Sequence, residues 1–120
     1  MKQNNKIFGD LGEDMAVDLL KKKGYMILER NYRNKYGEVD IIALKDEFLV
    51  FVEVKARKNR MFGSPQEAVD DAKIKHIVDT ADGFLQERAW HNVTVRFDIV
   101  EIVFDEKFIQ HIENAFYSYN

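Results

Sequence analysis

The order of apolar and polar positions along the chain predicts seven segments of regular structure. Apolar residues recur at helical spacing over 7–23 and again over 64–87. Five further stretches have the β-branched and aromatic composition of strands; they are 25–32, 37–44, 48–57, 93–104 and 107–112. The resulting order, α-β-β-β-α-β-β, predicts an α/β fold with a central mixed sheet covered by both helices.

Capping residues support the limits of both helices. Gly24 follows three lysines, and both the glycine and the positive charges are typical of a helix C-terminus. Ser64, with Pro65 and Glu67 after it, is typical of a capped helix start. Residues 1–6 are largely polar, and we expect them to lie outside the first helix.

The chain order also limits the topology. A long helix between two strands implies a right-handed parallel crossover, here from 48–57 to 93–104. A ferredoxin-like α+β domain is the alternative architecture, but its strand order suits this pattern less well. With 120 residues, the chain is expected to form a single domain spanning 1–120.

Three charged residues interrupt the apolar pattern of residues 37–57. Two apolar runs flank a short charged break in this stretch, which predicts a β-hairpin. Asp40 lies within the first run, and Glu53 and Lys55 lie within the second. Burial of such residues is unfavourable unless they are paired or bind a metal. This conflict with the pattern is the first indication of function.

The predicted hairpin brings the three charges together. With a loop of two or of four residues, paired positions sum to 93, so Asp40 lies opposite Glu53. Directly opposed residues have Cβ atoms ~5 Å apart. Lys55 is two residues after Glu53 and therefore shares its face. A loop of odd length would instead place Asp40 on the other face of the sheet.

Two neighbouring carboxylates repel each other, and a divalent cation between them removes the repulsion. Oxygen ligands favour hard ions such as Mg²⁺, which is usually held by one or two carboxylates together with substrate phosphate. Lys55 is then placed to stabilise developing negative charge or to orient an attacking water. This pattern indicates a metal site for phosphodiester hydrolysis. The alternative is a strand whose charged residues face solvent on a one-sided sheet.

The hairpin sequence resembles the YraN family of predicted bacterial endonucleases, which have the restriction-endonuclease-like PD-(D/E)XK fold. Similar residues occur in the archaeal Holliday-junction resolvases of that superfamily. The hairpin segments that carry the resemblance are Gly37-Glu38-Val39-Asp40-Ile41-Ile42 and Phe51-Val52-Glu53-Val54-Lys55-Ala56-Arg57. It extends over nearly the whole chain, including Gly12-Glu13, Gly63-Ser64-Pro65, Lys73, Arg96-Phe97-Asp98 and Asn114-Ala115-Phe116.

The resemblance implies roles for specific residues. Asp40 and Glu53 are expected to hold Mg²⁺ or Mn²⁺, and Lys55 to assist catalysis. Glu13 sits beside the apolar stripe of the first helix, where a solvated acid is the plain interpretation; the resemblance implies an outer metal ligand. Gln66 and Lys73 are expected to support the site from the second helix. The proline of the superfamily's name is absent, because a valine precedes Asp40.

Two basic segments are candidates for contacting nucleic-acid phosphates. Arg33 and Lys35 are interleaved with tyrosines after the first predicted strand, where they are equally typical of a charged sheet edge. Arg57, Lys58 and Arg60 leave the hairpin beside the predicted site. For both segments, the alternative interpretation is a basic surface that contacts only solvent.

Composition and charge narrow the class of protein. There is no cysteine, which excludes disulfides and thiolate metal sites. No signal peptide or spanning segment is recognisable, so we expect a cytoplasmic protein with no membrane partner. The net charge of −3 argues against a strongly electrostatic, non-specific binder of nucleic acid.

Two other polar residues have simpler interpretations. Asp98 interrupts the apolar run of 93–104 and is expected to pair with Arg96 or with a basic residue of a neighbouring strand, with a secondary metal role as the lesser alternative. His76 has no partner at metal-ligand spacing and is interpreted as structural or exposed.

The principal functional hypothesis is a Mg²⁺-dependent endonuclease acting on DNA, with branched or structured DNA suggested by the resolvase resemblance. The alternative is a nucleic-acid-binding or adaptor protein that keeps the nuclease fold with little turnover. A protein-interaction module is a third hypothesis, based on apolar residues at 116–119. Cutting of both strands would need two sites and hence a symmetric homodimer.

Overall fold

In the computed structural model, which describes residues 2–61, 70–90 and 92–116, two helices pack on a five-stranded sheet. The elements occur in the predicted order α-β-β-β-α-β-β, with one 3₁₀ turn before the last strand. They are α1 (Lys2–Lys22), β1 (Met26–Asn34), β2 (Gly37–Lys45), β3 (Phe48–Arg57), α2 (Asp71–Arg88), β4 (Thr94–Val103), η1 (Phe104–Glu106) and β5 (Phe108–Phe116).

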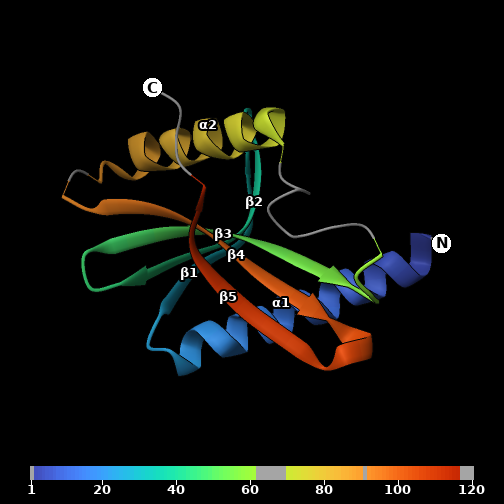
Figure 1. The fold of residues 1–120 in the computed structure, drawn as a ribbon. Helices are drawn as coiled ribbons and strands as arrows, with labels where there is room; N and C mark the ends of the chain where they lie inside the picture. The colour runs from blue at the N-terminus through green and yellow to red at the C-terminus, as the bar shows by residue number, and fades with distance from the viewer. Residues whose placement is uncertain (1, 62–69, 91, 117–120) are drawn as a thin grey trace.

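The five strands lie in the sheet in their order along the chain, β1-β2-β3-β4-β5. Neighbouring strands are antiparallel except β3 and β4, which are parallel and are connected through α2. The mixed sheet and the parallel crossover predicted from the sequence are therefore confirmed. Figure 1 shows α2 above this sheet and α1 below it.

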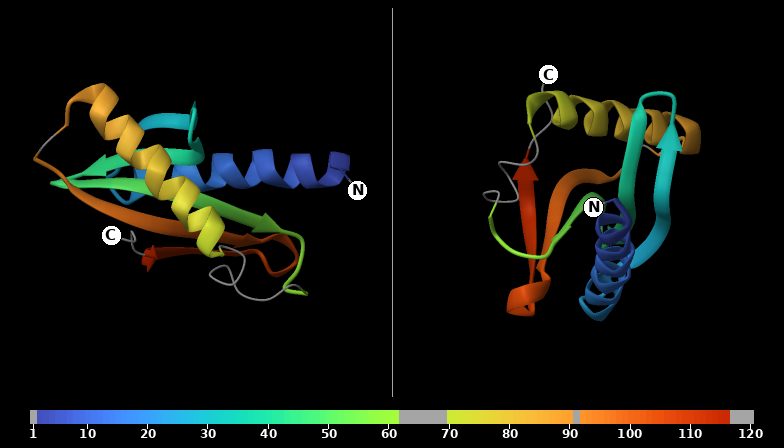
Figure 2. Two further views of the ribbon diagram at one scale, coloured as in Figure 1. Left: turned by 90° about the horizontal axis from the view of Figure 1, so that it is seen from above. Right: turned by 90° about the vertical axis from the view of Figure 1, so that its right-hand side faces the viewer.

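Each helix covers its own hydrophobic cluster. The cluster under α1 includes Ala16, Leu20, Val50, Val52, Val100 and Ile102. The cluster under α2 includes Ile77, Phe84, Phe51, Phe97 and Ile99. Strand residues alternate between the two clusters because successive side chains point to opposite faces. The end-on view of α1 in Figure 2 shows how strongly the sheet twists between the two helices. No helix among the described residues has the length and apolar character needed to cross a membrane.

Both helices begin at residues other than those predicted. The first helix starts at Lys2, so the prediction that residues 1–6 lie outside it is wrong for residues 2–6. The second starts at Asp71, because the side chain of Asp70 accepts a hydrogen bond from the backbone N–H of Lys73 and caps the helix there. The predicted capping residues Ser64 to Glu67 lie outside the described residues.

A close contact fixes α1 against the sheet. A Cβ atom built on Gly12 would lie 2.3 Å from the Cβ atom of Ala56 and 3.4 Å from Cδ1 of Ile102. Real Cβ atoms do not approach so closely, so only glycine allows the helix to cross β3 at this distance. The neighbouring Glu13 is thereby held near the hairpin strands.

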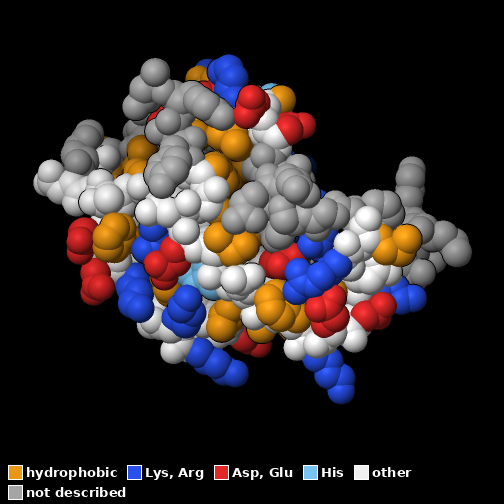
Figure 3. All heavy atoms as spheres, viewed as in Figure 1, with side chains coloured by type: hydrophobic (Ala, Val, Ile, Leu, Met, Phe, Trp, Pro, Cys, Tyr) orange, Lys and Arg blue, Asp and Glu red, His pale blue; other side chains and the backbone are white. Residues whose placement is uncertain are grey.

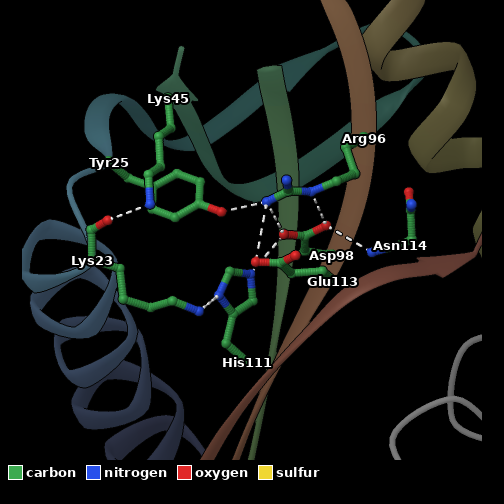
Figure 4. Close-up of polar contacts among 8 residues, drawn as sticks. All are labelled: Lys23, Tyr25, Lys45, Arg96, Asp98, His111, Glu113 and Asn114. Atoms are coloured by element: carbon green, nitrogen blue, oxygen red, sulfur yellow. Dashed lines mark hydrogen bonds and ion pairs between the residues drawn. The ribbon is translucent and has the colours of Figure 1, made fainter. Parts of the chain in front are cut away.

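The buried ion pair between Arg96 and Asp98 on β4 contacts β5 and the segment between α1 and β1. Asp98, which is fully buried, accepts two 2.9 Å hydrogen bonds from Arg96, as predicted from the sequence. It also bonds Nε2 of His111 at 2.6 Å and the backbone N–H of Asn114 at 3.1 Å. Figure 4 shows that Tyr25 contacts the same arginine through its hydroxyl group. The pKa of Asp98 is lowered because these hydrogen bonds outweigh its burial.

The last strand is longer than predicted and ends in the core. Phe116 is buried, and its ring stacks on Phe97 with centroids 5.3 Å apart. Phe116 is therefore not part of an exposed apolar surface, and it gives no support to the hypothesis of a protein-interaction module. Residues 117–119 lie outside the described part of the chain.

Candidate metal and phosphate site

The β2–β3 hairpin has the predicted register. Lys45 pairs with Phe48 across a two-residue turn, and Ile41 pairs with Val52, so paired positions sum to 93. The ladder ends at Ile41 and Val52. The next positions in this register are Asp40 and Glu53, just beyond the last backbone pair of the two strands.

Beyond the last backbone pair, a side-chain hydrogen bond connects β2 to β3. The Oδ2 atom of Asp40 accepts a 2.8 Å hydrogen bond from the backbone N–H of Val54. The nearby backbone of Asp40 lowers the pKa of Glu53, although burial outweighs this effect. The regular alternation of β2 is also interrupted, because Val39 and Ile42 pack in the same cluster although they are three residues apart. The two acids are therefore close neighbours across the opening of the hairpin.

Burial makes both carboxyl groups unusually reluctant to ionise. Glu53 is only 7% exposed, and its pKa is raised from 4.5 to about 7 by burial and by the charge of Asp40. The pKa of Asp40 is raised mainly by burial, with the hydrogen bond from Val54 opposing the shift. Two adjacent acids with raised pKa values are typical of functional sites rather than of solvated strands.

Two lysines lie on the α2 side of the hairpin. The Nζ atom of Lys73 lies 3.3 Å from Oε2 of Glu53 and lowers the pKa of that carboxyl group. Lys55 is half-buried, and alternation along β3 places its side chain on the same face as Glu53. Among the described residues, Lys55 makes no hydrogen bond or ion pair. It is thus available to a ligand at the site.

Glu13 approaches the pair from α1. Its Oε1 atom accepts hydrogen bonds from Arg30 at 3.1 Å and from Asn31 at 2.9 Å. After burial, the charge of Glu13 also contributes to the raised pKa of Asp40. Glu38, by contrast, is exposed and pairs with Arg33 at 2.7 Å, so it does not join the acidic pair.

The carboxylates at the hairpin opening meet the ligand requirement of Mg²⁺ but not that of a site built from three protein ligands. Within the described residues, no group of three or more His, Asp or Glu side chains is arranged to hold a metal ion. Mg²⁺ often uses only one or two carboxylates and completes its octahedron with water and phosphate. The convergent carboxylates of Asp40 and Glu53 fit that requirement, and burial leaves their negative charges poorly solvated.

The basic residues named as phosphate-binding candidates have different surroundings. Arg57 is largely buried and pairs with the buried carboxylate of Glu101. Arg60 pairs with Glu106 at 2.9 Å and lies over the ring of Phe108. Arg33 pairs with Glu38, as described above. Two exposed lysines of this set leave most charge for a ligand: Lys58, and Lys35, whose ammonium lies over Tyr36.

The distribution of charge on one face agrees with the low net charge. In Figure 3, basic and acidic side chains are interspersed over the face that the view shows. Positive charge is not concentrated there, so this face has no uniform attraction for a phosphate backbone. Gln66 lies outside the described residues, and its expected role stays a prediction.

Sequence reasoning missed two relationships. The buried pair between Arg57 and Glu101 joins β3 to β4, and the parallel register places Lys55 beside Glu101. The only sequence signal was the acid within an otherwise apolar run of 99–103. The contact between His111 and Asp98 had no local signal, since it depends on how β5 pairs with β4.

Comparison with known proteins places the chain in a family. The model described as "Uncharacterised protein family UPF0102" matches residues 12–102, which is most of the chain. The chain belongs to UPF0102. The match includes both hairpin carboxylates, Lys55, Glu13 and Lys73, and it ends before β5. The resemblance to the YraN family is confirmed at this level.

Individual UPF0102 proteins are similar over almost their full length. One from Clostridioides difficile (strain 630) is 48% identical over 113 residues, covering 94% of this chain and 99% of its own. One from Clostridium perfringens (strain 13 / Type A) is 42% identical over 120 residues, covering 100% and 93%. One from Persephonella marina is 44% identical over 110 residues, covering 92% and 93%.

Proposed function

We propose that this UPF0102 protein is a Mg²⁺-dependent endonuclease that hydrolyses DNA phosphodiester bonds, with branched or structured DNA as the expected substrate. The observation that supports this most directly is the adjacent pair of carboxyl groups at the opening of the hairpin, where Glu53 is buried and Asp40 is half-buried. A site built only for stability would not place two acids together in an apolar setting, because each disfavours ionisation of the other.

Each side chain has a chemical role in this proposal. Asp40 and Glu53 would hold Mg²⁺ or Mn²⁺, and Glu13 would act from outside the immediate ligand set. A bound dication neutralises phosphate charge and lowers the pKa of a bound water. Lys55 would stabilise the charge that develops on the phosphate oxygens or orient the attacking water. The hydrogen bond from Val54 to Asp40 keeps one carboxylate oxygen fixed.

Cleavage assays with matched variants test the proposal. Purified protein is incubated with supercoiled plasmid and with four-way-junction DNA, in Mg²⁺, in Mn²⁺ and in EDTA. We expect metal-dependent nicking that Asp40→Ala and Glu53→Gln abolish. Glu38→Gln is the control, because it removes an exposed carboxylate two residues from Asp40 that pairs with Arg33. Equal cleavage by the wild type and Asp40→Ala would indicate a contaminating nuclease and contradict the proposal.

A second candidate is a nucleic-acid-binding or adaptor protein with little or no turnover. The absence of a three-ligand metal group among residues 2–61, 70–90 and 92–116 favours this alternative. Calorimetric titration with Mn²⁺ distinguishes the two functions. Binding that is lost in Glu53→Gln supports the nuclease, whereas DNA binding without any Mn²⁺ binding supports the adaptor.

A further inference from the structure

Among the described residues, Lys73 is the one side chain that forms an ion pair with either carboxylate of the Asp40–Glu53 pair. It lies in the first turn of α2, where its backbone N–H is used to cap the helix against Asp70. Its ammonium group reaches Oε2 of Glu53 at 3.3 Å. A cation near a helix N-terminus is unfavourably placed with respect to the helix dipole, so its position is better explained by the site than by the helix.

The ion pair between Lys73 and Glu53 is exposed to solvent on the lysine side, as a reversible contact requires. The side chain of Lys73 is 45% exposed, whereas that of Glu53 is 9% exposed. The ammonium therefore enters from solvent and can return to it without moving the backbone. The 3.3 Å separation is longer than the ~2.7–2.9 Å of a strong charge-assisted hydrogen bond.

Another buried acid of the sheet, Asp98, provides a contrast. Asp98 is held by two nitrogens of Arg96, by His111 and by the backbone N–H of Asn114, so that every donor is fixed by its own packing. An arginine fork of this kind is a rigid structural partner, whereas a lysine is a flexible point charge. The acids of the hairpin are thus neutralised by a partner that a metal ion can replace.

We propose that Lys73 is a displaceable counter-ion: its ammonium neutralises the Asp40–Glu53 pair when no metal is bound, and a divalent cation must displace it to occupy the site. The inference rests on the proposed metal-dependent function. It adds a regulatory property, because metal binding then competes with an ion pair within the protein. The displaced ammonium is left at the entrance to the site, where an incoming phosphate supplies a new partner.

Lys73→Met tests the proposal, with Lys75→Met as the matched control. Lys75 lies on the same helix but pairs with Asp79 at 2.9 Å. Mn²⁺ affinity is measured by calorimetry without DNA. Because a unit positive charge within several Å opposes a dication even at high dielectric, we expect Lys73→Met to bind Mn²⁺ about tenfold more tightly than the wild type. Lys75→Met should stay within about twofold of the wild type.

A second measurement in EDTA reports the ion pair without metal. Lys73→Met should lower the melting temperature, because the buried carboxylate of Glu53 loses its counter-charge. In a Glu53→Gln background the same substitution should have little effect, since the ion pair is already absent. This coupling is independent of whether the protein binds metal or cleaves DNA.

Three results distinguish failure of the Lys73 counter-ion from failure of the proposed metal site. Tighter Mn²⁺ binding by Lys73→Met, together with the coupling in EDTA, supports the counter-ion. Unchanged or weaker binding by Lys73→Met, in a protein whose wild type binds Mn²⁺ through Glu53, overturns the counter-ion and leaves the nuclease proposal intact. Failure of both the wild type and Lys73→Met to bind Mn²⁺ overturns the metal site itself, and displacement with it.

Discussion

The backbone N–H of Val54 on β3 donates a 2.8 Å hydrogen bond to the Oδ2 atom of Asp40 on β2. The main-chain ladder between the two strands has already ended at this point, so the carboxylate takes the place of a backbone acceptor. Asp40 therefore holds the two strands together and is also a candidate metal ligand. Substitutions that remove only one of these two roles show which of them stability and activity depend on.

Asp40→Asn is expected to stabilise the metal-free protein while abolishing metal-dependent cleavage. The amide oxygen still accepts the hydrogen bond from Val54, and the neutral group no longer repels Glu53. We expect the free energy of unfolding at pH 7.5 in EDTA to rise by about 1 kcal/mol. Asp40→Ala loses the hydrogen-bond acceptor and should lie below Asp40→Asn. Chemical denaturation measures both, and an Asn variant less stable than the Ala variant would contradict this account.

The stability of the metal-free protein is expected to fall between about pH 5 and pH 8. Glu53 has a pKa of about 7 in the folded state against 4.5 in its ordinary state. For an acid whose pKa is raised by folding, the contribution to stability is complete below the unfolded pKa and is lost as the pH rises through the folded pKa. We expect a loss on the order of 2–3 kcal/mol, measured by urea denaturation in EDTA.

Two controls identify the group responsible for this pH dependence. Glu53→Gln should reduce the slope and leave the contribution of Asp40, whose pKa is also raised, whereas Glu38→Gln, which changes an exposed acid, should leave the profile close to that of the wild type. Asp98 has a lowered pKa, so its contribution is present above its ordinary pKa and is lost only in more acidic solution. It therefore adds no slope between pH 5 and pH 8. A rise of stability with pH in that interval would show that Glu53 is not protonated in the fold.

The hairpin was predictable because all of its determinants are local. Two apolar runs, a two-residue break and the even loop parity together place Asp40 beside Glu53, and the observed register agrees. The pairing of Arg96 with Asp98 was predictable for the same reason, since residues two apart on a strand share a face.

The remaining features depend on how distant segments pack. The cap at Asp70 competes with an equally good signal at Ser64, and local sequence does not decide between two caps. Contact between Lys73 and Glu53 requires α2 to lie on one particular face of the sheet. The contact of Glu13 with Arg30 requires the angle at which α1 crosses the strands. That angle depends on the fit of Gly12 against Ala56, which no periodic pattern encodes.

Asp98→Asn is expected to be strongly destabilising. The substitution removes the charge that compensates the buried guanidinium of Arg96 and places an amide donor among four existing donors. Removing one partner of a buried pair typically lowers the free energy of unfolding by about 3–5 kcal/mol. Arg33→Gln, which breaks an exposed pair with Glu38, should change it by less than about 1 kcal/mol.

A double variant keeps this prediction testable if Asp98→Asn does not fold. Arg96→Met with Asp98→Asn removes both charges, so the unpaired guanidinium no longer exists. The double variant should be more stable than Asp98→Asn alone, as judged by thermal unfolding. A double variant that is less stable by the sum of the single effects would show that the pair is not coupled.

Gly12→Ala is expected to weaken the packing of α1 on the sheet even though alanine is the better helix former. The new methyl group would lie 2.3 Å from the Cβ atom of Ala56, so the helix must shift away from β3. We expect a loss of about 1–3 kcal/mol in the free energy of unfolding. Gly9→Ala is the matched control, because nothing lies within 4 Å of the added Cβ atom. This control should gain about 0.5–1 kcal/mol from helix propensity.

A second substitution shows whether Gly12→Ala loses stability through a steric clash or through the backbone conformation of residue 12. Ala56→Gly removes the atom that the new methyl group meets, so Gly12→Ala with Ala56→Gly should recover part of the lost stability. The same pair tests the connection with function, since Glu13 follows Gly12 directly and its charge acts on Asp40. Gly12→Ala should weaken Mn²⁺ binding, and the double variant should restore it. Loss of stability without any rescue would mean that the glycine is required for its backbone alone.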